Sequence, residues 1–348
     1  MQTIYDFPMK KLELVFEGLG EKKFRAKQVY EWLYRKRVLS FDAMSDIKQD
    51  LQKKLANTYC IDPLTLVDKQ VSQDGTIKFL FALQDGALIE TVMMVYAFGK
   101  SVCVTSQVGC NMGCTFCASG LLKKNRNLTA GEMTAQVMYI QKMLDETNER
   151  VANVVIMGTG EPFDNYDNVM DFLATVNHDL GLAIGARHLT VSTCGIVPKI
   201  REFGKANDQY NLAISLHAPN NALRSELMPI NQAYPLEELM DALNEYCSYS
   251  NRRITFEYIL LKNKNDSKQH ANELADLIRG LNAYVNLIPY NVVDEKGYRS
   301  VDRQSAMVFY DYLMKRGIRA TLRKEHGSDI DAACGQLRAK RAKEGKHD

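Results

Sequence analysis

The stretch of sequence that decides the fold is Ser101-Val-Cys103-Val-Thr-Ser-Gln-Val-Gly-Cys110-Asn-Met-Gly-Cys114-Thr-Phe-Cys117. Its first half is a short apolar run typical of a buried strand, and its second half is a turn with three cysteines spaced C-x3-C-x2-C. Three thiolates this close in sequence can enclose one inorganic centre, and thiolates suit iron–sulfur clusters and zinc. The stretch therefore predicts a metal centre at the end of a strand.

The number of clustered cysteines favours an iron–sulfur cluster over zinc. Zinc sites built from C-x2-C usually use a second such pair farther along the chain, and the sequence holds no second pair. A 4Fe–4S cluster on three protein thiolates leaves one iron open to a small molecule. We expect one 4Fe–4S cluster on Cys110, Cys114 and Cys117. A zinc-stabilised RNA-binding protein without catalysis is the alternative of a different class, and iron and labile-sulfide analysis separates the two.

Beyond this turn, short apolar runs alternate with helical patterns. Strand–helix repetition predicts parallel strands in a barrel or a doubly wound sheet. Polar and small residues follow the runs, for example Gly158-Thr-Gly-Glu-Pro162, so we expect the site at the carboxyl ends of the strands. The expected strands are Val102–Thr105, Val154–Met157, His188–Ser192, Leu212–Leu216, Ile254–Leu260, Val285–Ile288 and Arg319–Leu322, with helices such as Ala130–Leu144, Pro235–Tyr249 and Lys268–Ile278 between them.

The chain upstream of the cysteine turn shows two other patterns. Residues 1–62 read as a helical accessory module, with helices near residues 12–19 and 24–34 and a third from Ser40 to about Leu55. Residues 63–98 read as a β hairpin with strands Thr76–Leu83 and Ala87–Met94. The core domain is then expected over residues 99–337, followed by a basic tail at 338–348.

Length and composition are those of an ordinary globular protein of about two domains. The 348 residues are 46% hydrophobic and 25% charged, and no run of about 18 uncharged apolar residues occurs. The N-terminus lacks the basic-then-apolar order of a secretory signal, so we expect a cytoplasmic protein that does not enter the membrane. The net charge is +2, yet residues 1–40 carry nine Lys and Arg against five acidic residues, and residues 315–348 carry ten against five. Basic ends around an acidic centre favour a polyanionic partner.

A C-x3-C-x2-C turn just after the first strand of a βα series resembles the radical S-adenosylmethionine (SAM) superfamily, and Gly158–Pro162 resembles its GGE-type loop. Four further segments are similar to the RlmN/Cfr family of RNA methyltransferases, and the likeness extends over nearly the whole chain. These segments are Val104–Cys110, Ser215–Pro219, Met228–Asn231 and Gly327–Leu337. The resemblance implies an α/β fold, a partial (β/α)6 TIM-like radical SAM barrel with an N-terminal helical module and a β hairpin.

The resemblance also implies a reaction, namely methylation of carbon 2 of an adenosine in the peptidyl transferase centre of 23S rRNA and of the adenosine 3′ of the anticodon in tRNA. Two SAM molecules serve each turnover. Cys334 would accept the methyl group, and Cys103 would release the product by forming a transient disulfide with Cys334. Glu90 matches the family's proton acceptor. The Cfr-type reaction, methylation of carbon 8 with ribosomal antibiotic resistance, stays open as the alternative.

Other residues and partners follow from the same resemblance. Cys194 stands where the family has serine, and like Cys60 and Cys247 we expect it to be structural. The expected partners are 23S rRNA, tRNA and an electron donor such as flavodoxin, and we expect a monomer. The residues implied for SAM are Gly160, Glu161, Ser192, Ser215, Leu216, His217 and Asn291. Basic side chains suited to RNA phosphates are Lys22, Lys23, Arg25, Arg35, Lys36, Arg37, Arg323, Lys324 and Lys340.

Overall fold

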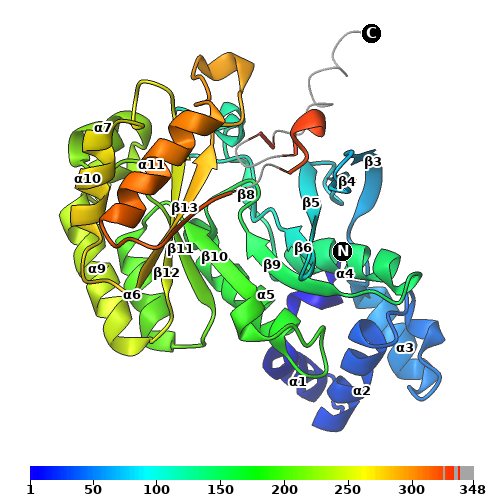
Figure 1. Cartoon of the computed structure of the whole chain (residues 1–348). Helices are drawn as coiled ribbons and strands as arrows, with labels where there is room; N and C mark the ends of the chain where they lie inside the picture. Colours follow the sequence, from blue (N-terminus) through cyan, green and yellow to red (C-terminus); the bar gives the residue numbers. More distant parts are fainter. Residues whose placement is uncertain (324–325, 333–335, 338–348) are drawn as a thin grey trace.

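The computed structural model describes residues 1–323, 326–332 and 336–337. Within these residues the strands of one sheet follow the order β14-β13-β12-β11-β10-β9-β6-β5-β4-β3 (Figure 1). The strands from β6 to β14 pair in parallel, which confirms the α/β class and the partial barrel. They are β6 (Gly99–Cys103), β9 (Val151–Ile156), β10 (Leu189–Thr193), β11 (Asn211–Ser215), β12 (Ile254–Leu260), β13 (Ala283–Pro289) and β14 (Ala320–Leu322).

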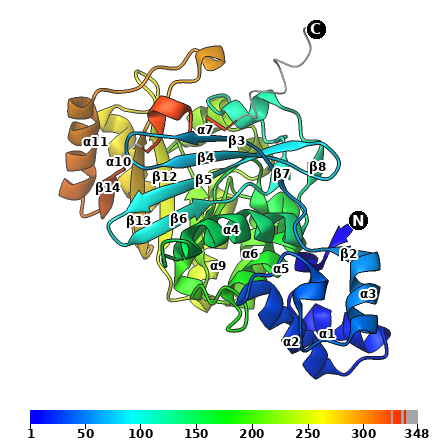
Figure 2. The same ribbon diagram turned by 90° about the vertical axis from the view of Figure 1, so that its right-hand side faces the viewer.

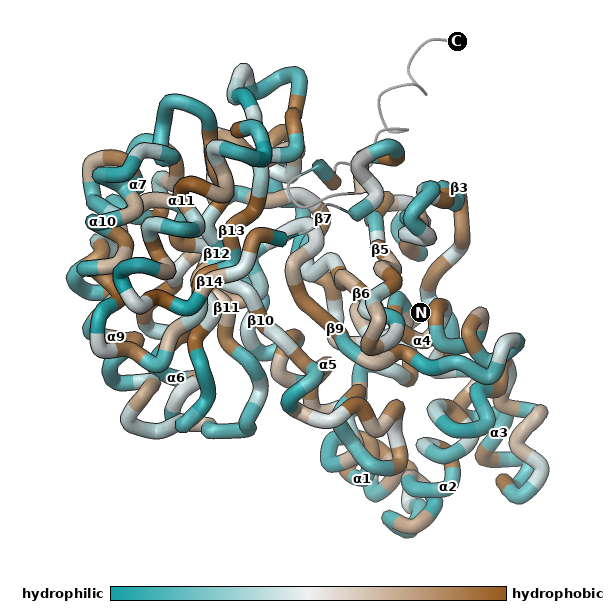
Figure 3. Tube along the Cα trace, in the orientation of Figure 1, coloured by the Kyte–Doolittle hydropathy of each residue, from teal (hydrophilic) through white to brown (hydrophobic). Residues whose placement is uncertain are grey.

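Helices cover the outside of the parallel strands, as the alternation in the sequence predicts. Each helix turns one apolar face inward, and the trace in Figure 3 alternates between hydrophobic and hydrophilic positions along these helices. Parallel strands buried on both faces explain the mostly apolar runs, such as Ile254–Leu260. The helices are α4 (Ala130–Asp145), α5 (Tyr166–Asn177), α6 (Val197–Ala206), α7 (Asn221–Leu227), α8 (Ile230–Ala233), α9 (Leu236–Tyr249), α10 (Lys268–Leu277) and α11 (Arg303–Lys315).

An antiparallel extension continues the sheet beyond β6 (Figure 2). The expected hairpin is present as β4 (Ile77–Ala82) and β5 (Leu88–Tyr96), and β5 pairs with β6 through the partners Val92 and Cys103. A further strand, β3 (Thr65–Val71), adds to β4 and was not predicted. Nearly all of β3 is exposed, so it lacks the apolar alternation that identifies a half-buried strand.

The N-terminal module contains α1 (Met9–Gly18), α2 (Lys23–Tyr34) and α3 (Gln49–Thr58). The prediction of a helix beginning at Ser40 is wrong, because residues 41–43 form one 3-10 turn and α3 begins only at Gln49. Phe41, Met44 and Ile47 are buried at a helical spacing, but they lie in irregular backbone. The Gln52 side chain donates to the carbonyls of Met44 and Ile47, which closes this irregular stretch against α3.

The C-terminal segment returns to the β3–β4 end of the sheet. Residues 326–332, which include the 3-10 turn η7 (Ser328–Ile330), lie beside the turn between β3 and β4 in both ribbon views (Figures 1 and 2). Cys334, Lys324, Lys340 and the basic tail at 338–348 lie outside the described residues. In the part of the chain that the structure describes, no helix combines the length and apolar character needed to cross a membrane.

Candidate active site

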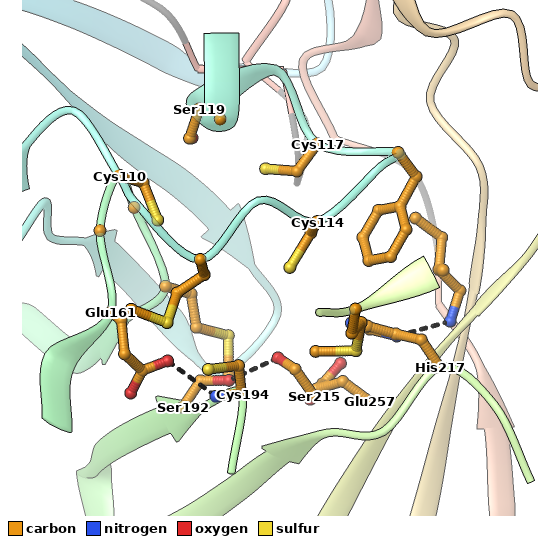
Figure 4. A pocket seen from close by; sticks show the side chains of 18 of the residues that line it. Cys110, Cys114, Cys117, Ser119, Glu161, Ser192, Cys194, Ser215, His217 and Glu257 are labelled. Atoms are coloured by element: carbon orange, nitrogen blue, oxygen red, sulfur yellow. Dashed lines mark hydrogen bonds between the residues drawn. The ribbon is translucent and has the colours of Figure 1, made fainter. Parts of the chain in front are cut away.

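A cavity opens at the carboxyl ends of the parallel strands, where the sequence places its polar residues (Figure 4). The loops after β6 and β9 form one part of its wall, and the ends of β10, β11 and β12 form another. Parallel strands end at the same edge of a barrel, so residues distant in sequence converge there. The predicted residues that line the cavity are Cys110, Cys114, Cys117, Gly160, Glu161, Ser192, Ser215 and His217.

The three cysteines of the C-x3-C-x2-C turn lie together on one side of this cavity (Figure 4). The turn is fixed by backbone hydrogen bonds from Cys110 N to Leu122 O, at 3.0 Å, and from Thr115 N to Leu227 O, at 2.9 Å. Burial raises the pKa of the Cys110 thiol to about 11, with a further contribution from Cys117. Burial likewise raises the pKa of Cys114, and the nearby Cys117 and Cys110 add to it.

These mutual effects mean that ionised thiolates would repel one another, and a cationic inorganic centre among them removes that cost. No group of three or more His, Cys, Asp or Glu in the described residues is arranged to hold a single metal ion. A 4Fe–4S cluster differs from a single ion because each protein thiolate binds a different iron. Three soft donors that face one cavity from one turn therefore fit such a cluster.

Glu161 supplies a buried carboxyl group across the cavity from the cysteines (Figure 4). It accepts hydrogen bonds from the backbone N–H of Cys194, at 2.7 Å, and of Phe163, at 2.9 Å. Burial raises the pKa of Glu161, and these hydrogen bonds oppose the rise. A fixed, buried carboxylate of this kind can bind a ligand ammonium group.

His217 enters the cavity in its neutral form. Its backbone is left-handed, with φ of 57°, and its Nδ1 accepts a hydrogen bond from Ile259 N at 3.1 Å. Burial lowers the pKa of His217 to about 3, and the nearby Arg224 cation lowers it further. Ser192 and Ser215, on adjacent strands, lie with their hydroxyl oxygens 3.4 Å apart. The cavity is thus lined by neutral polar groups together with the carboxyl groups of Glu161 and Glu257 and the guanidinium of Arg323.

Two predicted SAM residues lie near this cavity but do not line it. Leu216 is fully buried after β11, and Asn291 is buried in the loop that follows β13. Neither residue is among the described residues that line the cavity.

Sequence reasoning missed three residues at this site. Cys194 lines the cavity, and its backbone N–H binds Glu161. Glu257, on β12, also lines the cavity, and burial raises its pKa while Arg323 and Asn286 oppose the rise. Arg224 is fully buried on α7 and donates to Cys194 O at 2.6 Å and to Asn231 Oδ1 at 2.9 Å. Only the Cys194 substitution within a recognisable motif gave a signal in the sequence.

Glu90 on β5 and Cys103 on β6 are not among the described residues that line this cavity, and Glu90 lines a separate pocket with Lys78 and Asp331. Glu90 is buried, and its Oε1 lies 3.5 Å from Nζ of Lys78 on the adjacent strand. Cys103 is buried in a small apolar cluster with Val92 and Ala332. Met157 packs against that cluster and also lines the cavity. Cys103 is therefore a neighbour of the cavity that the three-cysteine turn lines.

The chain is similar to known proteins over almost its full length. Residues 2–61 match the ribosomal RNA large subunit methyltransferase N-terminal domain, and residues 104–277 match the radical SAM superfamily. A curated relative from Enterococcus faecalis, named "Probable dual-specificity RNA methyltransferase RlmN", is 57% identical over 99% of this chain and 98% of its own. A relative of the same name from Spiroplasma citri is 55% identical over 98% of both chains.

One solved structure covers the same extent. The crystal structure of a radical SAM methyltransferase from Sphaerobacter thermophilus is 44% identical in sequence, with a TM-score of 0.93. The likeness covers 97% of this chain and all of that one. The names of these relatives favour the RlmN type over the Cfr type.

Proposed function

The chain belongs to the RlmN family of radical SAM RNA methyltransferases, and from that premise we propose that it methylates carbon 2 of adenosine in 23S rRNA and in tRNA. One observation carries the proposal: the three-cysteine turn and Glu161 share a cavity, and Cys103 lies beside it through the cluster that contains Met157. The proposed reaction requires a methyl-carrying cysteine and its partner to reach both bound SAM and an RNA base. A Cys103 next to the cavity is consistent with that requirement.

The family implies a 4Fe–4S cluster and SAM, which when bound supply a 5′-deoxyadenosyl radical. Cys110, Cys114 and Cys117 would hold the cluster. Glu161 would bind the SAM ammonium, since it is a buried carboxyl on a rigid loop. The neutral groups of Ser192, Ser215 and His217 would contact the rest of the SAM molecule, with Gly160 forming part of the wall. Leu216 and Asn291 would support these residues from outside the lining. Two SAM molecules would be used in each turnover.

Cys334 would carry the methyl group as a thioether, and Cys103 would attack its sulfur once the carbon is attached to the base. The position of Ala332 supports this pairing, because it packs in the Cys103 cluster only two positions before Cys334. Glu90 would accept the proton lost from carbon 2. Nζ of the buried Lys78 lies 3.5 Å from Oε1 of Glu90, so the proposed base is held in an ion pair with the adjacent strand.

The two cysteines should fail in different ways, and that difference tests the proposal. Cys334→Ala removes the methyl acceptor, so no covalent protein–RNA product can form. Cys103→Ala leaves the attached base without its displacing thiolate, so RNA should stay crosslinked to Cys334. Denaturing electrophoresis and peptide mass spectrometry after expression with RNA provide the measurement, with Cys247→Ala as control. Crosslinks in the reverse pattern, or turnover by both variants, would contradict the mechanism.

The finer assignments belong to the same proposal. We propose 23S rRNA and tRNA as substrates, an electron donor such as flavodoxin, a monomer and a cytoplasmic location. Liquid chromatography and mass spectrometry of nucleosides from a deletion strain, before and after complementation, separate 2-methyladenosine from 8-methyladenosine in each RNA. Appearance of 8-methyladenosine alone would replace the carbon-2 assignment with the Cfr-type reaction.

A further inference from the structure

The turn between β3 and β4 forms a hydrogen-bonded contact with the segment 326–332, some 250 residues later in the chain. Asp329 accepts from the Ser72 hydroxyl at 2.6 Å and from the backbone N–H of Gln73 at 3.2 Å. In the opposite direction, the backbone N–H of Gly327 donates to Asp74 Oδ2 at 3.2 Å. The turn and the segment 326–332 thus each contribute one carboxylate acceptor and at least one hydrogen-bond donor to the contact.

The contact also includes a buried cation. Lys78, the second residue of β4, donates from Nζ to the carbonyl oxygen of Asp331 at 3.4 Å. The same Nζ lies 3.5 Å from Oε1 of Glu90. Lys78 and Glu90 have side chains only 8% and 5% exposed, so their attraction is weakly screened by water. Lys78 therefore connects the segment to the proposed base.

Gly327 allows the segment to approach the turn closely. Its φ is +63°, in the left-handed region, and a Cβ placed there would lie 2.9 Å from Thr76 Cγ2 and 2.8 Å from Ala332 Cβ. The backbone N–H groups of Ile330 and Ala332 both donate to Gly327 O, which folds the segment into a compact loop. Any side chain at this position would push the loop away from the turn.

The chain is held again just beyond Cys334. Ser119, which lines the cavity, donates its hydroxyl to Leu337 O at 3.2 Å, and Gln336 Nε2 donates to Val292 O at the same distance. Cys334 is therefore two positions from Ala332, which packs against Cys103, and three positions from Leu337, which accepts from the cavity residue Ser119.

We propose that the β3–β4 turn and Lys78 form a dock for the segment 326–332, which holds the chain immediately before Cys334 next to Cys103 and Glu90. The dock is defined by Ser72, Gln73, Asp74, Thr76 and Lys78. This inference rests on the proposed function, because it assigns the dock to the cysteine that carries the methyl group. These are positioning residues, since they act through Cys334 and Glu90.

Two variants release the segment from the dock and one does not. Gly327→Ala introduces the clash with Thr76, and Asp329→Ala removes the acceptor for Ser72 and Gln73. Gly86→Ala is the matched control, because Gly86 also has a positive φ, of +82°, but no atom lies within 4 Å of the added Cβ. The control thus reproduces the backbone strain without the steric conflict.

Hydrogen–deuterium exchange of the full-length holoenzyme tests the dock directly. Amides of 326–332 should exchange faster by roughly tenfold in Gly327→Ala and Asp329→Ala than in wild type or Gly86→Ala. The ratio of 5′-deoxyadenosine formed to RNA methylated should rise by a similar factor, because radical formation continues while Cys334 is misplaced. Lys78→Met should raise the same ratio and also lower the melting temperature, because it removes the cation that pairs with the buried Glu90 carboxylate.

The results separate the dock from the proposed function. Unchanged exchange in both release variants would overturn the dock, and so would faster exchange with an unchanged product ratio. If the wild-type enzyme itself forms no methylated RNA, the proposed function fails, while the exchange measurement still reports whether the contact exists.

Discussion

At the scale of single residues, Arg224 is a buried cation without a carboxylate to balance it. No Asp or Glu of the described residues forms a salt bridge with it, and its side chain is fully buried. A buried charge is costly unless it is compensated. Arg224 binds Cys194 O, and Cys194 lies in the cavity that the three-cysteine turn also lines. Thiolates and an anionic cluster in that cavity would provide the missing compensation.

We therefore expect Arg224→Met to lower the free energy of unfolding by about 2–5 kcal/mol, because Cys194 O and Asn231 Oδ1 each lose a donor in a buried position. Arg224→Lys keeps the charge but cannot reach both acceptors, so its loss should be smaller. Urea unfolding under anaerobic conditions measures both variants. Equal stability of Arg224→Met and wild type would show that the two hydrogen bonds contribute nothing.

Because the pKa of His217 is lowered in the folded state, the free energy of unfolding should depend on pH in a defined direction. Burial lowers its folded-state pKa from 6.5 to about 3, so the unfolded chain binds this proton more readily throughout that range. Stability present above pH 6.5 is lost as the pH falls toward 3. At pH 5.5 the loss from this group is about 1.4 kcal/mol. His217→Asn, which tolerates the left-handed backbone, should lose less stability than wild type between pH 7.5 and 5.5, and parallel urea-unfolding curves would refute the assignment.

Without the family resemblance, the residues of the site were predictable only where local spacing carries the chemistry. The C-x3-C-x2-C turn and Gly158–Pro162 were found because each is contiguous in sequence. Arg224 and Glu257 were not, because an isolated charged residue shows nothing until the fold determines what surrounds it. Lys78 was missed for the same reason, since its partner Glu90 lies on another strand.

At the scale of elements, the start of α4 forms the contact between the barrel and the N-terminal module. Thr129 and Glu132 form a capping box there, and the backbone N–H of Gly131 donates to Asp6 Oδ1 at 2.8 Å. A Cβ on Gly131 would lie 2.3 Å from Thr3 Cγ2 and 2.7 Å from Asp6 N. Glycine in a helix is unfavourable by itself, so here it serves the close approach of two segments.

Gly131→Ala should consequently destabilise the protein by about 1–3 kcal/mol, although alanine is the better helix former. Gly18→Ala in α1 is the control, because nothing lies within 4 Å of its added Cβ, and it should be neutral or stabilising. Thermal unfolding and limited proteolysis of the first 62 residues measure the effect. A stabilised Gly131→Ala variant would mean that the N-terminal module shifts to accommodate the added methyl group without loss of stability.

Strands were predicted best where both faces of the sheet are covered by other parts of the protein. β12 was predicted with its observed bounds, Ile254–Leu260, because a strand covered on both faces is mostly apolar, and only Thr255 and Glu257 interrupt this one. β3 was missed, because an exposed edge strand carries no such pattern. At Ser40 a misleading pattern was present instead of an absent one. Irregular backbone buries Phe41, Met44 and Ile47 at intervals that a helix would also produce.

At the scale of the whole molecule, the N-terminal module lies away from the end of the barrel where the C-terminal segment is docked (Figure 1). Several of its basic side chains are already neutralised, since Lys23 pairs with Glu17, Arg35 with Glu31, and Arg37 with Asp145. Lys22 and Lys36 are exposed and form no salt bridge with a described residue. If the module binds RNA, these two of its predicted basic residues are free to contact phosphates, and the RNA must be long enough to reach them from the cavity.

Substrate length should therefore decide whether these lysines matter. Lys22→Gln combined with Lys36→Gln should weaken binding of a long, folded RNA and reduce the slope of log affinity against log salt by about 1.4, from two lost phosphate contacts. A short stem-loop that occupies only the cavity should be methylated as by wild type, and 5′-deoxyadenosine formation should not change. Lys199→Gln combined with Lys205→Gln is the charge-matched control, because both lysines lie on α6 and are paired with glutamates. Filter binding across a salt series measures the slope. An equal loss on long and short RNA would place the effect at the cavity, and no loss on either would exclude these two lysines as RNA contacts.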